Sequence, residues 1–368
     1  MTSLFITGAT GALGLPLIAA LLAQKRHDRI IAFVRGEPAL LIDHLARHHP
    51  ELDLATLTIA RGSLTEPDGL VELAKNGPIG TVLHLAASTK FRAPEATLAA
   101  INVEGTRRLL DWAQCQAVPP RFIHFSTTCA AGRRTGEIAE APLRDEQGFV
   151  NGYERTKWAA ENLVLASPLQ PEIVRLATVV GSAADGHLHR PGAFHTTLRW
   201  LHAGLLPMVP GNADTKLDLL HTELIGDFIT RLLARPARPQ GIYHLSRGTQ
   251  AIPLAALLDL GTEKFSAIHP AWRSGQILPP VLAPRAAFDD FRLSIAQSRD
   301  FLFNQVLESV DSFLPELFYP KQYQTRQAEL VFGGALPFPD WRPWIGQVID
   351  SALASDFGRK EITPSLSP

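Results

Sequence analysis

The feature that most constrains the fold is a glycine-rich turn near the N-terminus. It reads Thr7-Gly8-Ala9-Thr10-Gly11-Ala12-Leu13-Gly14 and separates an apolar run, Ser3–Thr7, from a helical pattern. Glycine lets the backbone turn tightly and approach a pyrophosphate, and a helix N-terminus offers free N–H groups to it. The turn therefore predicts a βαβ unit that binds a dinucleotide. The alternative is a strand–helix turn that binds nothing.

Further apolar runs alternate with helical patterns through the first half of the chain. Strands are expected at Ser3–Thr7, Arg29–Val34, Thr56–Ala60, Thr81–Ala86, Arg121–Ser126 and Glu172–Val180. Alternation of strands and helices at this spacing is typical of a parallel sheet that is covered on both faces. The fold class predicted is α/β, with a Rossmann-type doubly wound sheet of six or seven strands.

The regular alternation of expected strands and helices ends after about residue 180. We expect residues 1–180 to form the dinucleotide-binding domain, which also carries the catalytic side chains. Residues 181–368 are expected to form a smaller, mostly helical substrate lobe with a C-terminal helical extension, in which strands near 215–221 and 241–246 are able to rejoin the main fold. Residues 362–368 are expected to be a frayed tail.

Composition excludes several classes of protein. A hydrophobic content of 46% with 19% charged residues describes a chain that buries a sizeable core. A formal net charge of −1 argues against general nucleic-acid binding. Two cysteines rule out a disulfide framework or a Cys-rich metal site, so no metal is expected. No apolar stretch is long enough to span a membrane and no signal peptide is recognisable, so a cytoplasmic protein is expected.

Tyr153 and Lys157 form the second informative motif, because no other Tyr in the chain has a Lys four residues later. This spacing puts both side chains on one face of a helix expected over 152–166. A free phenol has a pKa of about 10, and a nearby ammonium stabilises the phenolate and lowers that pKa. Behind the glycine turn, the pair indicates hydride-transfer chemistry. The alternative is an amphipathic helix with a half-buried Tyr and a Lys that reaches solvent.

The end of the second expected strand bears on the choice of nicotinamide cofactor. An acidic residue there binds the ribose 2′-hydroxyl, whereas an Arg accommodates a 2′-phosphate. The strand ends Phe33-Val34-Arg35-Gly36, and the first acid is Glu37. Arg35 therefore favours NADPH, and a solvated surface Arg is the alternative interpretation.

Motifs in the same order as those of the extended short-chain dehydrogenase/reductase family run through about the first 245 residues. The chain resembles that family in its Thr7–Gly14 turn, in His84-Leu85-Ala86-Ala87, in Ile101–Thr106 around Asn102, in Ser126-Thr127, in Tyr153 with Lys157, and in Arg175…Gly181. His84 is expected to be a buried, hydrogen-bonded residue near the cofactor.

The resemblance implies a role for each matching position. Tyr153 would exchange a proton with the substrate oxygen, and Lys157 would lower its pKa and hold the nicotinamide ribose. Thr127 would bind the same oxygen, with Thr128 as the competing choice, and Asn102 would fix a helix distortion or a water. The cofactor would lie against Gly8, Thr10, Gly11, Ala12, Leu13, Gly14, Arg35, Ser63, Leu64, Ala86, Ala87, Tyr153 and Lys157.

Finer details resemble one branch of the family, the thioester reductases and fatty acyl reductases. The segment Tyr153–Glu161 is similar to their Y-x-x-(S/T)-K-W-x-A-E, and Ser126…Gly136 is similar to their loop. The resemblance implies that NADPH reduces an acyl thioester, held on a carrier protein or coenzyme A, to an aldehyde or alcohol. Residues 267–368 match no motif of the branch.

Other functions stay open. A ketone or hydroxysteroid-like reductase or dehydrogenase, and a sugar-nucleotide epimerase, would use the same Tyr and Lys, although Arg35 argues against the tightly held NAD of an epimerase. A non-catalytic NADPH-binding regulatory protein is less favoured, because such a protein has no need of Tyr153, Lys157, Thr127 and Asn102 together. Apolar residues of the lobe, such as Trp200 and Leu201, indicate either helix core, the favoured interpretation, or a lipophilic substrate.

Overall fold

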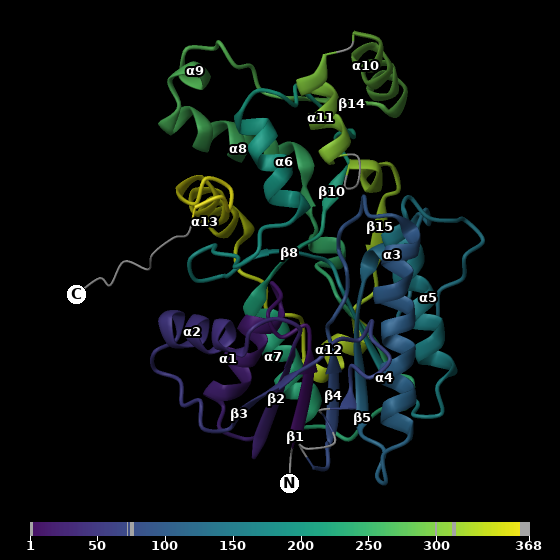
Figure 1. Cartoon of the computed structure of the whole chain (residues 1–368). Coiled ribbons are helices and arrows are strands. Elements are labelled where there is room, and N and C mark those ends of the chain that lie inside the picture. Colours follow the sequence, from purple (N-terminus) through teal and green to yellow (C-terminus); the bar gives the residue numbers. More distant parts are fainter. Residues whose placement is uncertain (1–2, 72, 74–76, 299, 311–313, 361–368) are drawn as a thin grey trace.

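A seven-stranded parallel sheet lies at the centre of the computed structural model, which describes residues 3–71, 73, 77–298, 300–310 and 314–360. The strand order is β12-β7-β5-β4-β1-β2-β3 (Figure 1). The strands are β1 (Ser3–Thr7), β2 (Arg29–Val34), β3 (Leu57–Arg61), β4 (Thr81–His84), β5 (Arg121–Thr127), β7 (Glu172–Leu176) and β12 (Ile242–Leu245). This architecture confirms the Rossmann-type doubly wound fold. The tail expected at 362–368 lies outside the described residues.

Helices cover both faces of this sheet (Figure 1). One face carries α1 (Gly14–Ala23), α2 (Pro38–His48), α7 (Thr222–Leu233) and α12 (Arg326–Phe332). The other carries α3 (Glu95–Ala99), the π-helical turn η2 (Ala100–Glu104), α4 (Gly105–Gln114) and α5 (Gly152–Ala166). Because α7 and α12 come from the second half of the chain, that half contributes to the core of the nucleotide-binding fold.

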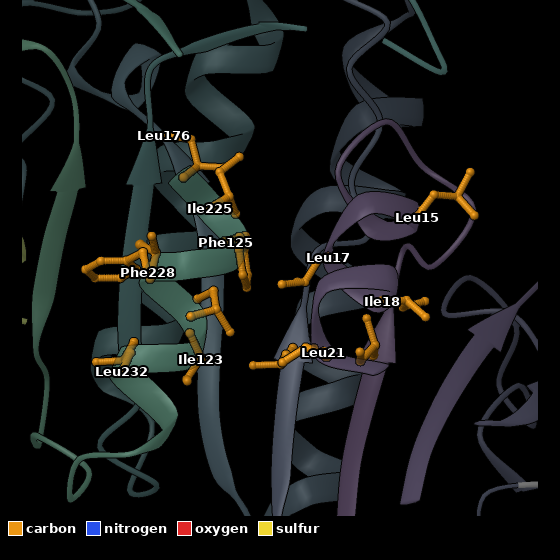
Figure 2. Packing of buried hydrophobic residues seen from close by; sticks show 14 of the residues in the cluster. Leu15, Leu17, Ile18, Leu21, Ile123, Phe125, Leu176, Ile225, Phe228 and Leu232 are labelled. Carbon is orange, nitrogen blue, oxygen red and sulfur yellow. The ribbon is translucent and has the colours of Figure 1, made fainter. Parts of the chain in front are cut away.

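The first of these faces is held together by aliphatic packing between α1 and α7 over the sheet. Figure 2 shows Leu17 and Leu21 of α1 on the side that faces α7, with Ile123 of β5 between the two helices. Phe228 of α7 is fully buried in the same cluster. Each such side chain stabilises the fold by about 1.5–3 kcal/mol through burial.

A second, smaller body packs above the carboxyl ends of the strands and has its own apolar core, which includes Phe265 and Trp344. Its elements are β8 (Thr178–Gly181), α6 (Ala193–His202), β9 (Met208–Pro210), β10 (Lys216–Leu217), β11 (Leu219–His221), β13 (Ile252–Pro253), α8 (Leu254–Ile268), α9 (Pro270–Arg273), β14 (Val281–Ala283), α10 (Arg285–Ser298), α11 (Phe301–Val310), the short 3₁₀ turn η5 (Leu314–Phe318) and α13 (Trp341–Ala354). We call this body the lobe.

The strands expected from the second half of the chain behave differently from one another. The segment near 241–246 forms β12, which joins the main sheet beside β7, whereas the segment near 215–221 forms two short strands in separate two-stranded sheets. A further parallel pair joins β6 (Gly136–Ile138) to β15 (Lys321–Tyr323). The C-terminal extension is thereby attached to the loop that follows β5.

The described residues contain no helix that is long and apolar enough to cross a bilayer. The same part of the chain has no group of three or more His, Cys, Asp or Glu side chains placed to hold a metal ion.

Candidate active site

The glycine turn forms a tight cradle at the N-terminus of α1. Gly8 has a φ of +72°, and a Cβ at this position would lie 2.8 Å from Ala86 N. A Cβ at Gly14 would lie 2.2 Å from the Gly8 carbonyl oxygen. Both contacts are with backbone, so neither position accepts a side chain without a backbone shift. Thr10, Gly11, Ala12 and Leu13 complete a turn whose shape fits a dinucleotide pyrophosphate at the helix N-terminus.

His84, at the end of β4, forms hydrogen bonds that hold the start of the glycine turn in place. Its Nδ1 lies 2.7 Å from Thr7 Oγ1 and its Nε2 lies 2.9 Å from Thr106 Oγ1. Thr7 Oγ1 in turn accepts a hydrogen bond of 3.1 Å from Ala86 N. Burial, reinforced by the charge of Lys157, lowers the pKa of His84 to about 3. A neutral, doubly hydrogen-bonded imidazole with no exposed surface is a structural residue, as the sequence predicted.

Tyr153 and Thr127 meet where β5 ends and α5 begins. The Tyr153 and Thr127 side chains line the same cleft, and Thr127 Oγ1 accepts a hydrogen bond of 3.2 Å from Cys129 N. Burial raises the pKa of Tyr153 well above its ordinary value. Burial thus outweighs the lowering of this pKa that was expected from Lys157, and the phenol is protonated at neutral pH. Thr128 lines the same cleft, and its carbonyl oxygen accepts a hydrogen bond from Tyr323.

Lys157 is buried one turn along α5. Its Nζ donates to the Phe125 carbonyl oxygen at 2.8 Å and lies 3.3 Å from His124 Nε2. Burial lowers the pKa of Lys157 to about 8, against the opposing effect of Glu161. The ammonium is therefore held against β5, and Lys157 is not among the residues that line the cleft beside Tyr153.

We predict that kcat/KM for the nicotinamide cofactor falls as the pH rises through about 8, because this parameter reports free-enzyme groups and Lys157 loses its charge in that range. The charged form is present below the pKa, so activity is retained on the acid side. Lys157→Arg keeps a permanent charge, and its residual activity should lack this alkaline limb. A wild-type profile that stays flat through pH 8 would contradict the assignment.

Asn102 lies at the middle of the π-helical turn η2, where a helix distortion was expected. Its Oδ1 accepts from Ser88 N at 2.7 Å, and its Nδ2 donates to Ser88 O at 3.2 Å and to Thr156 Oγ1 at 3.1 Å. Thr156 Oγ1 also donates to the Tyr153 carbonyl oxygen at 3.0 Å. Asn102 therefore connects the segment after β4 to the helix that carries the phenol.

The remaining cofactor positions follow β2, β3 and β4 at the same edge of the sheet. Arg35 is exposed just beyond β2, while Glu37 is paired with Arg61 at 3.4 Å. Beyond β3, Ser63 Oγ lies 2.8 Å from Thr65 Oγ1. Leu64, also predicted to contact the cofactor, accepts a hydrogen bond of 2.9 Å from Arg108 at its carbonyl oxygen. The predicted residues Ala86 and Ala87 follow β4 and are half-buried.

A cleft of about 560 Å³ lies between the sheet and the lobe. Ala12 and Leu13 of the glycine turn and Thr127 and Tyr153 of the strand–helix junction line one side of it. Its other walls come from α6, β10, η5 and the segment around residue 320. The cofactor cradle and the hydroxyl pair therefore open into one shared space, as a hydride transfer requires.

Several wall residues of the cleft were not predicted from the sequence. The Phe91 ring lies edge-on to Tyr153, with ring centroids 4.7 Å apart. Glu154, next to the catalytic position, is fully buried and interacts with Glu316, whose carboxylate pairs with Lys321 at 2.6 Å. No local pattern marks Glu316, because it reaches the cleft only through the folding of the C-terminal extension.

The charges of the cleft wall do not cancel. Within the described part of the chain, Lys90, Arg190 and Lys216 form no ion pair, and all three are exposed. The other cations of the wall are neutralised, as in the Arg92–Glu308 pair of 2.7 Å. Burial raises the pKa of Glu154 to about 9, so that carboxyl adds no charge at neutral pH. Burial raises the pKa of Asp218 only to about 6, so this carboxylate offsets one of the three cations. The excess of positive charge favours an anionic group on the ligand.

Comparison with known proteins places this site in a family. Residues 6–229 match the profile of an NAD-binding family described as male sterility protein. The chain is 29% identical over 223 residues to an isonitrile lipopeptide synthase of Streptomyces coeruleorubidus, a match that covers 55% of this chain and 15% of that protein. It is 26% identical over 280 residues to a putative fatty acyl-CoA reductase of Drosophila melanogaster, covering 61% of this chain and 50% of that protein.

Among solved structures, the terminal R domain from the myxalamid PKS-NRPS biosynthetic pathway superposes with a TM-score of 0.78 at 24% identity, covering 97% of this chain and 92% of that domain. This similarity shows a shared fold along nearly the whole chain, including the lobe. The matched regions of the two curated relatives span half of their length or less.

Proposed function

This chain belongs to the male sterility protein family of NAD-binding domains and is an oxidoreductase of the extended short-chain dehydrogenase/reductase type; from this premise we propose that it is an NADPH-dependent reductase of acyl thioesters. The proposal is supported by the similarity of the chain to an isonitrile lipopeptide synthase and to a putative fatty acyl-CoA reductase. The thioester would be carried by a carrier protein or by coenzyme A, and the product would be an aldehyde or an alcohol.

One observation carries this proposal: the buried Tyr153 lines, together with Thr127, the same cleft as Ala12 and Leu13 of the glycine turn. The Tyr153 phenol is protonated at neutral pH, and reduction of a carbonyl consumes a proton at the oxygen. The Tyr153 and Thr127 hydroxyls line the same cleft, and two hydroxyls on one carbonyl oxygen would stabilise the negative charge that develops there. These residues support the reductive direction.

The reaction follows from these positions. The nicotinamide supplies a hydride when it is bound. Thr127 and Tyr153 would bind the thioester oxygen, and Tyr153 would give its proton to that oxygen as the carbonyl carbon gains the hydride. The resulting hemithioacetal would break its C–S bond, release the thiol and leave an aldehyde. Lys157, whose Nζ donates to Phe125 O, would orient the cofactor ribose. Its positive charge would stabilise the phenolate that forms as Tyr153 loses its proton.

The unpaired cations of the cleft wall support a phosphate-bearing thioester. Lys90 follows β4 and Lys216 lies in β10, so the two come from the sheet side and the lobe side of the cleft. Coenzyme A and the phosphopantetheine of a carrier protein share a phosphate at some distance from the thioester. Electrostatic attraction between that phosphate and these side chains, which salt would weaken, would position the phosphopantetheine chain that carries the thioester.

The function is tested by oxidation of NADPH in the presence of one acyl group presented in different ways. The same acyl group is offered as an N-acetylcysteamine thioester, as a coenzyme A thioester and on a carrier protein. We expect thioester-dependent oxidation with all three and a higher kcat/KM for the phosphate-bearing forms. No oxidation with any of them, alongside turnover of simple ketones, would replace the proposal with the ketone-reductase alternative.

Cofactor preference is tested at Arg35. We predict that the wild type prefers NADPH and that Arg35→Ala raises KM for NADPH about tenfold to a hundredfold, because a charge-assisted hydrogen bond to phosphate contributes roughly 1.5–3 kcal/mol. The KM for NADH should change little, and it serves as the internal control since NADH lacks the 2′-phosphate. A wild type that prefers NADH would show the assignment to be wrong.

A further inference from the structure

An apolar cavity of about 50 Å³ lies inside the lobe, directly beside the active-site cleft. The cavity and the cleft share three wall residues, Phe194, Leu217 and Leu317. The rest of its wall comes mainly from α6, α8 and α13. The two cavities are therefore neighbours, and these three residues belong to the walls of both.

The wall of this cavity offers a ligand almost nothing to hydrogen-bond. Thr197 and Thr262 carry the side-chain hydroxyls among its lining residues. Thr197 Oγ1 donates to Ala193 O at 3.0 Å, and Thr262 Oγ1 donates to Leu258 O at 2.9 Å, each within its own helix. The other lining side chains are apolar or glycine. A ligand group that enters this cavity must therefore be a hydrocarbon.

The volume limits how much hydrocarbon fits. A water-sized group needs about 10–15 Å³ measured in this way, so about 50 Å³ holds roughly three to five such groups. Voids larger than one water are few in a packed protein interior. The cavity thus has the size of a short chain end rather than of a long lipid tail.

We propose that this cavity, the tail pocket, receives the end of a short aliphatic acyl group whose carbonyl lies at Thr127 and Tyr153 in the cleft. The inference rests on the proposed function and adds the substrate class to it. Leu201, a core residue of α6, has a second role as part of this wall. Each methylene that enters the tail pocket is expected to raise kcat/KM roughly threefold to fourfold, until the pocket is full.

Gly261 of α8 provides the test, because it lies in the wall with room in front of it. A Cβ built at Gly261 meets only the Phe265 ring, at 3.6 and 3.8 Å, which is ordinary contact. Gly261→Leu should therefore fill the tail pocket without displacing backbone. Gly334→Leu is the matched control, since an added Cβ there meets nothing within 4 Å and the position is exposed outside the lobe.

The measurement is kcat/KM over a series of straight-chain N-acetylcysteamine thioesters that starts at acetyl. We expect the wild type and Gly334→Leu to share one optimum length, and Gly261→Leu to move that optimum shorter by about three or four carbons, the size of the added side chain. Leu258→Ala removes carbons from the same wall and should move the optimum longer.

The outcomes separate the two levels of inference. Reduction of acetyl thioester with no dependence on chain length, or an equal loss at every length in Gly261→Leu and no shift in Leu258→Ala, would overturn the tail pocket while the proposed function stands. No reduction of any thioester by the wild type would overturn the proposed function and the tail pocket with it.

Discussion

Replacing Tyr153 with Phe is expected to lower kcat for thioester reduction by about 10²–10⁴, the usual contribution of a positioned general acid. The change removes one oxygen from a buried ring that packs edge-on against Phe91, so the shape of the cleft is kept. Thr127 alone would then face the developing negative charge, and the proton would have to come from solvent. NADPH affinity, measured by direct binding, should change much less than kcat.

Tyr243→Phe makes the same chemical change at a buried position outside the cleft. Tyr243 OH donates to Glu172 Oε1 at 3.0 Å, so this variant should lose some stability and keep its kcat. Retention of more than about a tenth of wild-type kcat by Tyr153→Phe would be too small a loss for a general acid and would remove Tyr153 from its assigned role.

The second large effect is expected on stability, at the buried ion pair between α5 and β7. Arg175 has no exposed surface, and its guanidinium forms a pair of 2.8 Å with Glu161 and lies 3.0 Å from His244 Nε2. Arg175→Met would leave the Glu161 carboxylate buried without its cation. We expect the free energy of unfolding to fall by about 3–5 kcal/mol in denaturant titrations.

Arg342→Met is the matched control for this prediction. Arg342 pairs with Glu263 at 2.7 Å, but both side chains are half or more exposed to solvent. Screening by water limits such a pair to about 0–1 kcal/mol. Equal losses of stability in the two variants would mean that burial does not govern the Arg175 pair.

Local pattern predicted the first strands of the sheet well. β1 and β2 begin and end where the apolar runs do, because buried parallel strands are continuous apolar segments bounded by turns. The expected strand at 172–180 is instead two strands, β7 and β8. They separate because β7 pairs with β5 and β12 in the main sheet, whereas β8 pairs with β11. A change of pairing partner leaves no mark in the hydrophobic pattern.

The site residues also fall into two groups, those that a local motif predicts and those that only the fold brings to the site. Thr127, Tyr153 and Asn102 were assigned from motifs of fixed spacing. In the structure Thr156 connects Asn102 to the backbone of Tyr153, and the side chains of Tyr153 and Thr127 line the same cleft. Residues that enter from distant segments, such as Glu316 and Lys216, carry no local signal because only the docking of the lobe brings them to the cleft. The tail pocket belongs to this second group, since its wall is assembled from helices whose sequences read simply as core.

Thiol release measured together with NADPH consumption is the most direct test of the central claim. The wild-type protein, given NADPH and a short acyl thioester, should release one thiol for each NADPH oxidised if it stops at the aldehyde, or one thiol for every two if it continues to the alcohol. Tyr153→Phe should show neither signal above background. NADPH oxidation that proceeds without any thiol release would contradict thioester reduction and leave this site with a different carbonyl substrate.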